Sequence, residues 1–323
     1  MEKYAYKKYI ATPETVLKKL KKYGVAVIPS ILDENECKQM QNGMWDTLEH
    51  ISQKWEQPID RNKKETWKNI KYLYPKHGML IQNFGIGHAQ FIWDLRMKEK
   101  LVNVFTKIWD CNKEDLITSF DATSFHLPSE VTNIGWHRND WYHTDQSFTR
   151  NNFECIQSWV TGFDVNKGDA TLGFLEKSHK YHKNFQQDYN ITDKNDWYKL
   201  TEEETNYFYD KCCVERKIYC PKGSMVLWDS RTIHCGVGPL KARGKENFRC
   251  VVYLCYTPKN KANQKVIDKK IKAFEEIRMT NHWPHKPKLF AKTPRTYGEE
   301  LKQMTPFSKP KINELGKSLI GYK

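Results

Sequence analysis

Two histidines and one aspartate have types and spacing that could bind a metal ion. His143 and Asp145 are separated by one residue, and His234 follows much later in the chain. In a β-strand, residues i and i+2 project from the same side, so His143 and Asp145 would point together with Thr144 turned away. Two imidazoles and one carboxylate can hold one face of an iron(II) ion and leave the other face open. The set predicts a metal oxygenase, although spacing alone leaves open that both histidines are ordinary hydrogen-bonded side chains.

The segments around these residues favour the metal site. Residues 136–142 are polar and aromatic, as expected beside a cleft, and residues 223–234 resemble a turn, a short apolar strand and a polar end. We therefore expect His234 at the point where that strand opens to the mouth of a barrel.

Composition limits the class of protein. The chain has 323 residues, of which 39% are hydrophobic and 13% aromatic, enough for one large domain or two small ones. No signal peptide and no apolar run of roughly 18–20 residues is evident, so we expect a soluble, cytoplasmic protein with no membrane association. Its nine cysteines, an odd number, favour reduced thiols over a disulfide framework.

The net charge of +14 raises the question of an anionic partner. Residues 257–323 carry 16 lysines and arginines against 6 acidic residues, so most of the excess lies in the C-terminal fifth. Lysines outnumber arginines 43 to 10, however, and arginine is the better residue for specific phosphate or base recognition. The basic region is either functional or a consequence of compositional bias.

Hydrophobic spacing indicates helices in the first third of the chain. The expected elements are a helix at 13–22, a strand at 25–30, a helix from its N-cap Asp33 to about Ser52, and a helix or helix pair at 91–109. Residues 53–76 are expected to form an irregular surface excursion.

Short strands separated by turn residues dominate from residue 116 onward and predict a sandwich or barrel. The expected strands are 117–126, 155–163, 170–175, 224–228 and 249–256. Residues 183–216 are expected to be an insertion with helical pieces. A lysine-rich helix is expected at 260–278, and the proline-containing remainder from Asn281 is expected to be largely irregular.

Four segments, in this order, resemble the phytanoyl-CoA dioxygenase-like (PhyH) branch of the Fe(II)/2-oxoglutarate oxygenases. They are residues 24–37, 141–146, 168–180 and 222–234, and the resemblance extends over roughly residues 16–258. It implies an α+β protein built on a double-stranded β-helix, that is, a jelly-roll or cupin-like barrel. Helices would flank the barrel on its N-terminal side, and a helical or irregular extension would follow it. We expect a single domain, 1–323, with the barrel core at about 116–258 and a basic extension at 259–323.

The resemblance also implies the cofactors, Fe(II) and the co-substrate 2-oxoglutarate, and assigns residues to them. His143, Asp145 and His234 would be the catalytic metal ligands. Arg249 would bind the distal carboxylate of 2-oxoglutarate through two parallel hydrogen bonds, with Arg243 as the competing choice. Trp159 and Gln90 match further co-substrate positions more loosely.

The implied activity is hydroxylation of a small-molecule metabolite with release of succinate and CO2. Because Asp145 is present, hydroxylation is favoured over halogenation, for which related enzymes lack the carboxylate. The alternative is a hydroxylase or demethylase acting on nucleic acid or protein, suggested by the basic and aromatic residues of 278–297. An anionic small substrate is compatible with the same residues, and the sequence leaves the substrate and the oligomeric state open.

Overall fold

Two β-sheets form the centre of the protein in the computed structural model, which describes residues 3–74, 79–298 and 300–322. The first sheet has the order β2-β10-β6-β12-β4 and is antiparallel. Its strands are β2 (Val25–Ile28), β4 (Thr123–His126), β6 (Ile156–Thr161), β10 (Met225–Asp229) and β12 (Arg249–Leu254).

The second sheet has the order β1-β9-β7-β11-β5-β8 and is mixed, because β1 pairs with β9 in parallel. Its strands are β1 (Tyr4–Ala5), β5 (His143–Thr144), β7 (Thr171–Leu175), β8 (Tyr198–Lys199), β9 (Glu215–Ile218) and β11 (His234–Val237). A small pair, β3 (Leu116–Thr118) with β13 (Tyr256–Pro258), lies beside the first sheet. This two-sheet arrangement is the one that jelly-roll folds share.

Alternation along the strands of the first sheet gives it two different faces. In β12, Cys250, Val252 and Leu254 belong to the core beneath the helices, whereas Val251 packs in the core between the two sheets. The same alternation puts Val160 of β6 under the helices and Trp159 between the sheets. Arg249 and Tyr253 therefore share the inner face with Trp159.

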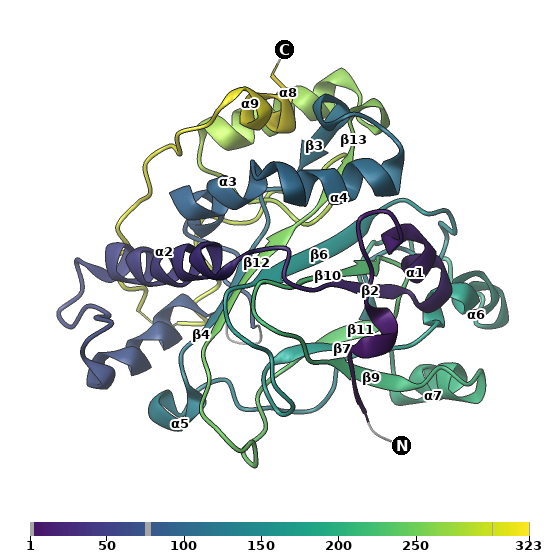
Figure 1. Ribbon diagram of the computed structural model, residues 1–323, viewed down its shortest axis with the longest axis horizontal. Helices are drawn as coiled ribbons and strands as arrows, with labels where there is room; N and C mark the ends of the chain where they lie inside the picture. Colours follow the sequence, from purple (N-terminus) through teal and green to yellow (C-terminus); the bar gives the residue numbers. More distant parts are fainter. Residues whose placement is uncertain (1–2, 75–78, 299, 323) are drawn as a thin grey trace.

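The outer face of the first sheet is covered by helices (Figure 1). These are chiefly α2 (Glu34–Ser52), α3 (Gln90–Arg96) and α4 (Glu99–Trp109), and α1 (Val16–Tyr23) packs beside β2. The start of α2 is as predicted, because the Asp33 side chain accepts a hydrogen bond from the Glu36 N–H in a capping box. The other helices are α5 (Ser129–Thr132), α6 (His182–Asp188), α7 (Glu202–Asp210), α8 (Gln264–Glu275) and α9 (Glu314–Ile320).

Several predicted elements need correction. Residues 117–126 are not one strand, because β3 ends at Thr118 and β4 begins at Thr123 in another sheet. Residues 53–76 are not merely a surface excursion: a 3-10 helix, Lys64–Leu73, buries Trp67, Ile70 and Leu73. The part of this segment at 75–76 lies outside the described residues.

The C-terminal region returns to the body of the protein. Helix α8 corresponds to the predicted lysine-rich helix, and the remainder is largely irregular except for α9, which packs on β3 and α8. In the described part of the chain, no helix has both the length and the apolar character needed to span a bilayer.

Candidate metal centre

His143, Asp145 and His234 converge at the edge where β5 and β11 meet. The two histidines face each other directly in the antiparallel register, with ring centroids 4.3 Å apart. Each of the three residues offers a ligand atom, and these atoms all lie within 4.8 Å of one another. All three side chains are buried. The arrangement matches a three-ligand set with one open face.

Both imidazoles have Nδ1 engaged and Nε2 directed toward Asp145. His143 Nδ1 donates to the Trp141 carbonyl at 3.3 Å, and His234 Nδ1 donates to the Thr232 carbonyl at 2.9 Å. A carbonyl can only accept, so each bond fixes the tautomer that leaves Nε2 with its lone pair. The Nε2 atoms lie 3.7 Å and 3.2 Å from the two Asp145 carboxylate oxygens. Burial, together with the nearby His234, lowers the pKa of His143 and favours the neutral ligand form.

Asp145 directly follows the short strand β5 and is held from several sides. Its N–H donates to the Ser230 carbonyl at 3.1 Å, and Gln157 Nε2 donates to its Oδ2 at 2.8 Å. Burial alone would raise the pKa of Asp145, but the neighbouring His282 and His143 hold it well below the ordinary range. The carboxylate is therefore ionised and oriented, as a metal ligand must be.

The intervening residue Thr144 behaves as the period-two spacing predicts. Its hydroxyl turns away from the metal site and donates to the Ser230 and Gln146 carbonyls. His234, however, does not end the strand that precedes it. β10 ends at Asp229, the chain turns, and His234 begins β11 in the other sheet. The turn forms because the Asp229 carboxylate accepts hydrogen bonds from the Arg231 N–H and guanidinium.

A cavity of about 290 Å³ lies between the two sheets, and the triad forms part of its wall. Trp141 stacks on His143 with ring centroids 4.6 Å apart and planes 5° from parallel. The wall combines aromatic and apolar side chains with about as many polar ones, so it can both enclose a small molecule and fix its orientation. Besides the triad, it includes Met79, Leu80, Gln82, Asp121, Ser124, Trp141, Gln157, Trp159, Thr171, Leu172, Trp197, Trp228, Gly236, Arg249, Tyr253, His282 and Phe290.

Arg249 reaches this cavity from the start of β12. Its Nε donates to Ser124 Oγ at 3.0 Å and its Nη1 to the Ala170 carbonyl at 2.8 Å. The guanidinium carbon lies 5.5 Å from the centre of the Trp159 ring. Since a guanidinium has five N–H donors, these two bonds orient it and leave donors for a carboxylate.

Arg243, the competing residue, lies elsewhere. Its guanidinium is engaged by the carboxylates of Glu130 and Asp169 at 2.6–2.9 Å. It is absent from the described residues that line the cavity. Its charge is thus already neutralised within the protein.

Gln90 is not brought to the site, contrary to the sequence prediction. It is the first residue of α3, and its amide bonds the Asp94 carboxylate and the main chain of Lys311. The reason is orientation, since this first helical position faces the C-terminal segment rather than the sheets. Among the aromatic residues near the H-x-D motif, Trp141 lines the cavity, whereas Tyr142 and Phe148 pack in a separate core cluster.

Sequence reasoning did not identify several wall residues. Gln157 lies two residues from Trp159 in β6, and Tyr253 lies four residues from Arg249 in β12. Each shares a strand face with a predicted site residue, so strand periodicity is a signal that points to both. Asp121 and His282 carry no comparable local signal, because one lies in an irregular stretch and the other in the C-terminal extension.

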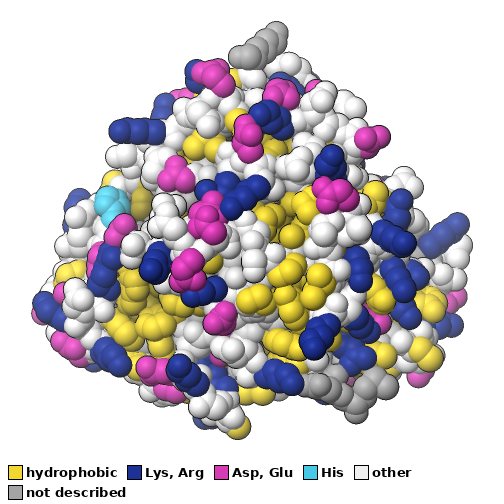
Figure 2. All heavy atoms as spheres, in the orientation of Figure 1, with side chains coloured by type: hydrophobic (Ala, Val, Ile, Leu, Met, Phe, Trp, Pro, Cys, Tyr) yellow, Lys and Arg dark blue, Asp and Glu magenta, His cyan; other side chains and the backbone are white. Residues whose placement is uncertain are grey.

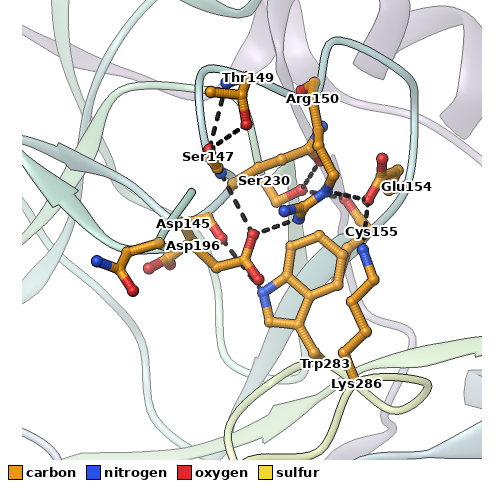
Figure 3. Close-up of polar contacts among 12 residues, drawn as sticks. Asp145, Ser147, Thr149, Arg150, Glu154, Cys155, Asp196, Ser230, Trp283 and Lys286 are labelled. Atoms are coloured by element: carbon orange, nitrogen blue, oxygen red, sulfur yellow. Dashed lines mark hydrogen bonds and ion pairs between the residues drawn. The ribbon is translucent and has the colours of Figure 1, made fainter. Parts of the chain in front are cut away.

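The C-terminal extension is joined to the H-x-D segment by Trp283. Its indole N–H donates to the Asp145 carbonyl at 3.2 Å (Figure 3). The Arg150 guanidinium and the Lys286 ammonium lie 5.3 Å and 5.1 Å from the centre of the same ring. Both cations also bond Glu154, at 2.9 Å and 3.0 Å. The backbone of a candidate metal ligand is therefore supported from outside the two sheets.

A buried pair of histidines and one aspartate in a cavity between two sheets is typical of mononuclear non-haem iron enzymes. The family model described as phytanoyl-CoA dioxygenase (PhyH) matches residues 20–237, which include all three residues. The chain belongs to this family.

The similarity to a curated fungal protein is at low identity. The chain is 26% identical over 211 residues to Ava biosynthesis cluster protein O of Aspergillus versicolor, a match that covers 63% of this chain and 66% of that protein. The chain thus spans just under two thirds of that relative's length.

Solved structures support the fold. A hypothetical protein, JW0805, from Escherichia coli aligns with a TM-score of 0.60 at 14% identity over 98% of this chain and 85% of its own. A putative oxidoreductase from Salmonella typhimurium aligns with a TM-score of 0.57 at 13% identity, covering 95% and 82% of the two chains.

Proposed function

We propose that His143, Asp145 and His234 bind the iron and that Arg249 binds the distal carboxylate of 2-oxoglutarate, so that the enzyme hydroxylates a small molecule. One observation carries the assignment. Three buried ligand atoms lie within 4.8 Å of one another in the wall of a cavity that also contains an oriented arginine. The donor set suits Fe(II), and a planar guanidinium suits a carboxylate.

Bound iron and 2-oxoglutarate supply the oxidation of a substrate C–H bond, with succinate and CO2 as co-products. The residues of this chain contribute positioning. The hydrogen bonds at Nδ1 align both histidines and set their tautomer, and Gln157 holds the Asp145 carboxylate. Trp141 covers His143, and Trp159 covers Arg249, so both groups are shielded from water.

A small-molecule substrate is supported by the size of the cavity and by the biosynthetic context in the name of the fungal relative. We further propose one domain, because the C-terminal extension contributes to the same cavity wall as the barrel strands.

The nucleic-acid alternative gains no specific support. On the face drawn in Figure 2, lysines and arginines are scattered among acidic and apolar side chains rather than gathered into one patch. Several cations of the extension are used internally: Lys286 bonds Glu154, Lys269 bonds the Pro287 carbonyl and Arg278 bonds the Phe290 carbonyl.

The test is succinate release in the presence of Fe(II) and 2-oxoglutarate, together with the amount of iron bound. Asp145→Ala should reduce both to the level of a protein-free control, because two imidazoles alone bind the metal weakly. Asp140→Ala, a nearby carboxylate that does not line the cavity, should leave both intact. Full turnover by Asp145→Ala would overturn the assignment.

A further inference from the structure

A loop of the C-terminal extension, residues 279–290, forms part of the cavity although it lies beyond the family match at 20–237. Its two arms are paired, with a β-bridge between Thr280 and Leu289 and a bond from the Asn281 N–H to the Lys288 carbonyl at 3.0 Å. The loop is therefore an ordered hairpin rather than a loose tail.

His282 projects from this loop into the cavity wall. Its Nε2 atom is shielded from solvent and has no hydrogen-bond partner among the described residues. The next residue, Trp283, is fully buried and bonded to the Asp145 backbone, which fixes the position of the loop. Buried polar atoms are nearly always satisfied, so an unpartnered one beside a cavity points to a group that enters from it.

Asp121 is a second polar group of this wall with an incomplete environment. The residue is 7% exposed, and its Oδ1 accepts a hydrogen bond from the Ala122 N–H at 2.6 Å. Arg96 donates to the Asp121 backbone carbonyl, not to the carboxylate. No ion pair to this carboxylate forms among the described residues, although a buried carboxylate without one is costly. Burial raises its pKa, and the nearby His282 opposes that shift.

The charges of the cavity are segregated. Arg249 is the only lysine or arginine among the described lining residues. In the register of β12 with β4 it lies opposite His126, the last residue of β4. Asp121 lies just before the beginning of the same strand. The wall also carries Trp197, which is 52% exposed, and Phe290. Away from Arg249 the cavity thus offers an unpaired carboxylate and flat apolar surfaces.

We propose that Asp121 and His282 recognise a hydrogen-bond-donating group, preferably a protonated amine, on a ring-bearing substrate of the oxygenase. This rests on the proposed function, and it excludes acidic substrates as the preferred class. The amine would complete the environment of Asp121, and the ring would lie against the aromatic residues of the wall.

The experiment measures binding without turnover. Mn(II) replaces Fe(II) in the protein, with 2-oxoglutarate present. The three probes are 2-phenylethylamine, 2-phenylethanol and 3-phenylpropionate. Proton NMR measures the binding of each probe near the metal by the broadening of its ring-proton signals. The amine should bind at least about tenfold more tightly than the acid, the size expected for a charge-assisted hydrogen bond. In Asp121→Asn that preference should fall to about twofold or less, and His282→Gln should weaken the amine and the alcohol alike.

Controls separate this proposal from the metal assignment. Asp140→Asn makes the same chemical change outside the cavity and should retain the wild-type preference. Mn(II) titration followed by electron paramagnetic resonance shows whether each variant keeps its metal site. Loss of Mn(II) binding by the wild type would overturn the proposed function itself. Normal Mn(II) and 2-oxoglutarate binding with no amine preference, or with no probe bound, would overturn the substrate class alone.

Discussion

Single atoms decide the chemistry available at the centre of this protein. The two imidazoles present Nε2 because backbone carbonyls occupy Nδ1, and Arg249 faces the cavity because Ser124 and Ala170 hold two of its N–H groups. A residue of the right type in another environment cannot substitute, as Arg243 shows, since its guanidinium is paired with two carboxylates.

Arg249→Lys should raise the KM for 2-oxoglutarate about 10- to 100-fold with a smaller change in kcat. Lysine keeps the positive charge but lacks the planar fork that makes two parallel bonds to a carboxylate, a loss of about 1.5–3 kcal/mol. Steady-state succinate release at varied 2-oxoglutarate measures it. Arg243→Lys is the matched control, because Arg243 lies outside the cavity; an equal effect in both variants would contradict the assignment of Arg249.

At the scale of elements, the strands set the direction of the site side chains, and a C-terminal loop supports one of the metal ligands. Alternation in β12 sends Arg249 and Tyr253 inward while Cys250 and Val252 pack under the helices. Asp145, by contrast, follows a strand of only two residues, so its position depends on contacts from the C-terminal loop.

Trp283→Phe should weaken iron binding about tenfold and lower the free energy of unfolding by about 1 kcal/mol. The ring still fills its site, but the indole N–H bond to the Asp145 carbonyl is lost, and outer-shell bonds of this kind orient metal ligands. Iron titration and urea unfolding measure the two effects. Trp136→Phe removes an indole bond to Asn133 at the surface and serves as control; unchanged iron affinity in Trp283→Phe would refute the supporting role.

For the whole molecule, buried histidines link stability to pH. Burial lowers the pKa of His88 and His126 to about 3 and that of His182 and His285 to about 4, and it also lowers the pKa of His143 and His179. In the unfolded chain these groups titrate near 6.5. Between these values the unfolded state binds more protons, so the folded state loses stability as pH falls.

The free energy of unfolding of the metal-free protein should therefore decrease steadily from about pH 6.5 to about pH 4. Urea unfolding at a series of pH values measures the slope. His88→Gln, which replaces one such histidine by a group that does not titrate, should reduce the proton uptake on unfolding by about one proton. Stability that is constant or increases toward pH 4 would contradict the prediction.

Local patterns were sufficient for much of this protein. Strand periodicity predicts that His143 and Asp145 point the same way and that Arg249 faces inward. The capping residue Asp33 marks the start of a helix in the same direct way. Periodicity does not reveal where an element breaks. For that reason the spacing predicts one strand at 117–126 and puts His234 at the end of the strand that precedes it, whereas the structure divides the first segment and begins β11 at His234.

Only the tertiary structure decided which distant residues share the cavity. Asp121 and His282 are 161 residues apart in the chain and meet because the C-terminal hairpin docks beside the H-x-D segment. Gln90 has a suitable side chain but faces outward, because the packing of α3 sets its direction. Side-chain chemistry is encoded at each position, whereas proximity depends on the packing of the whole chain, and that packing is what turned three spaced residues into a candidate site.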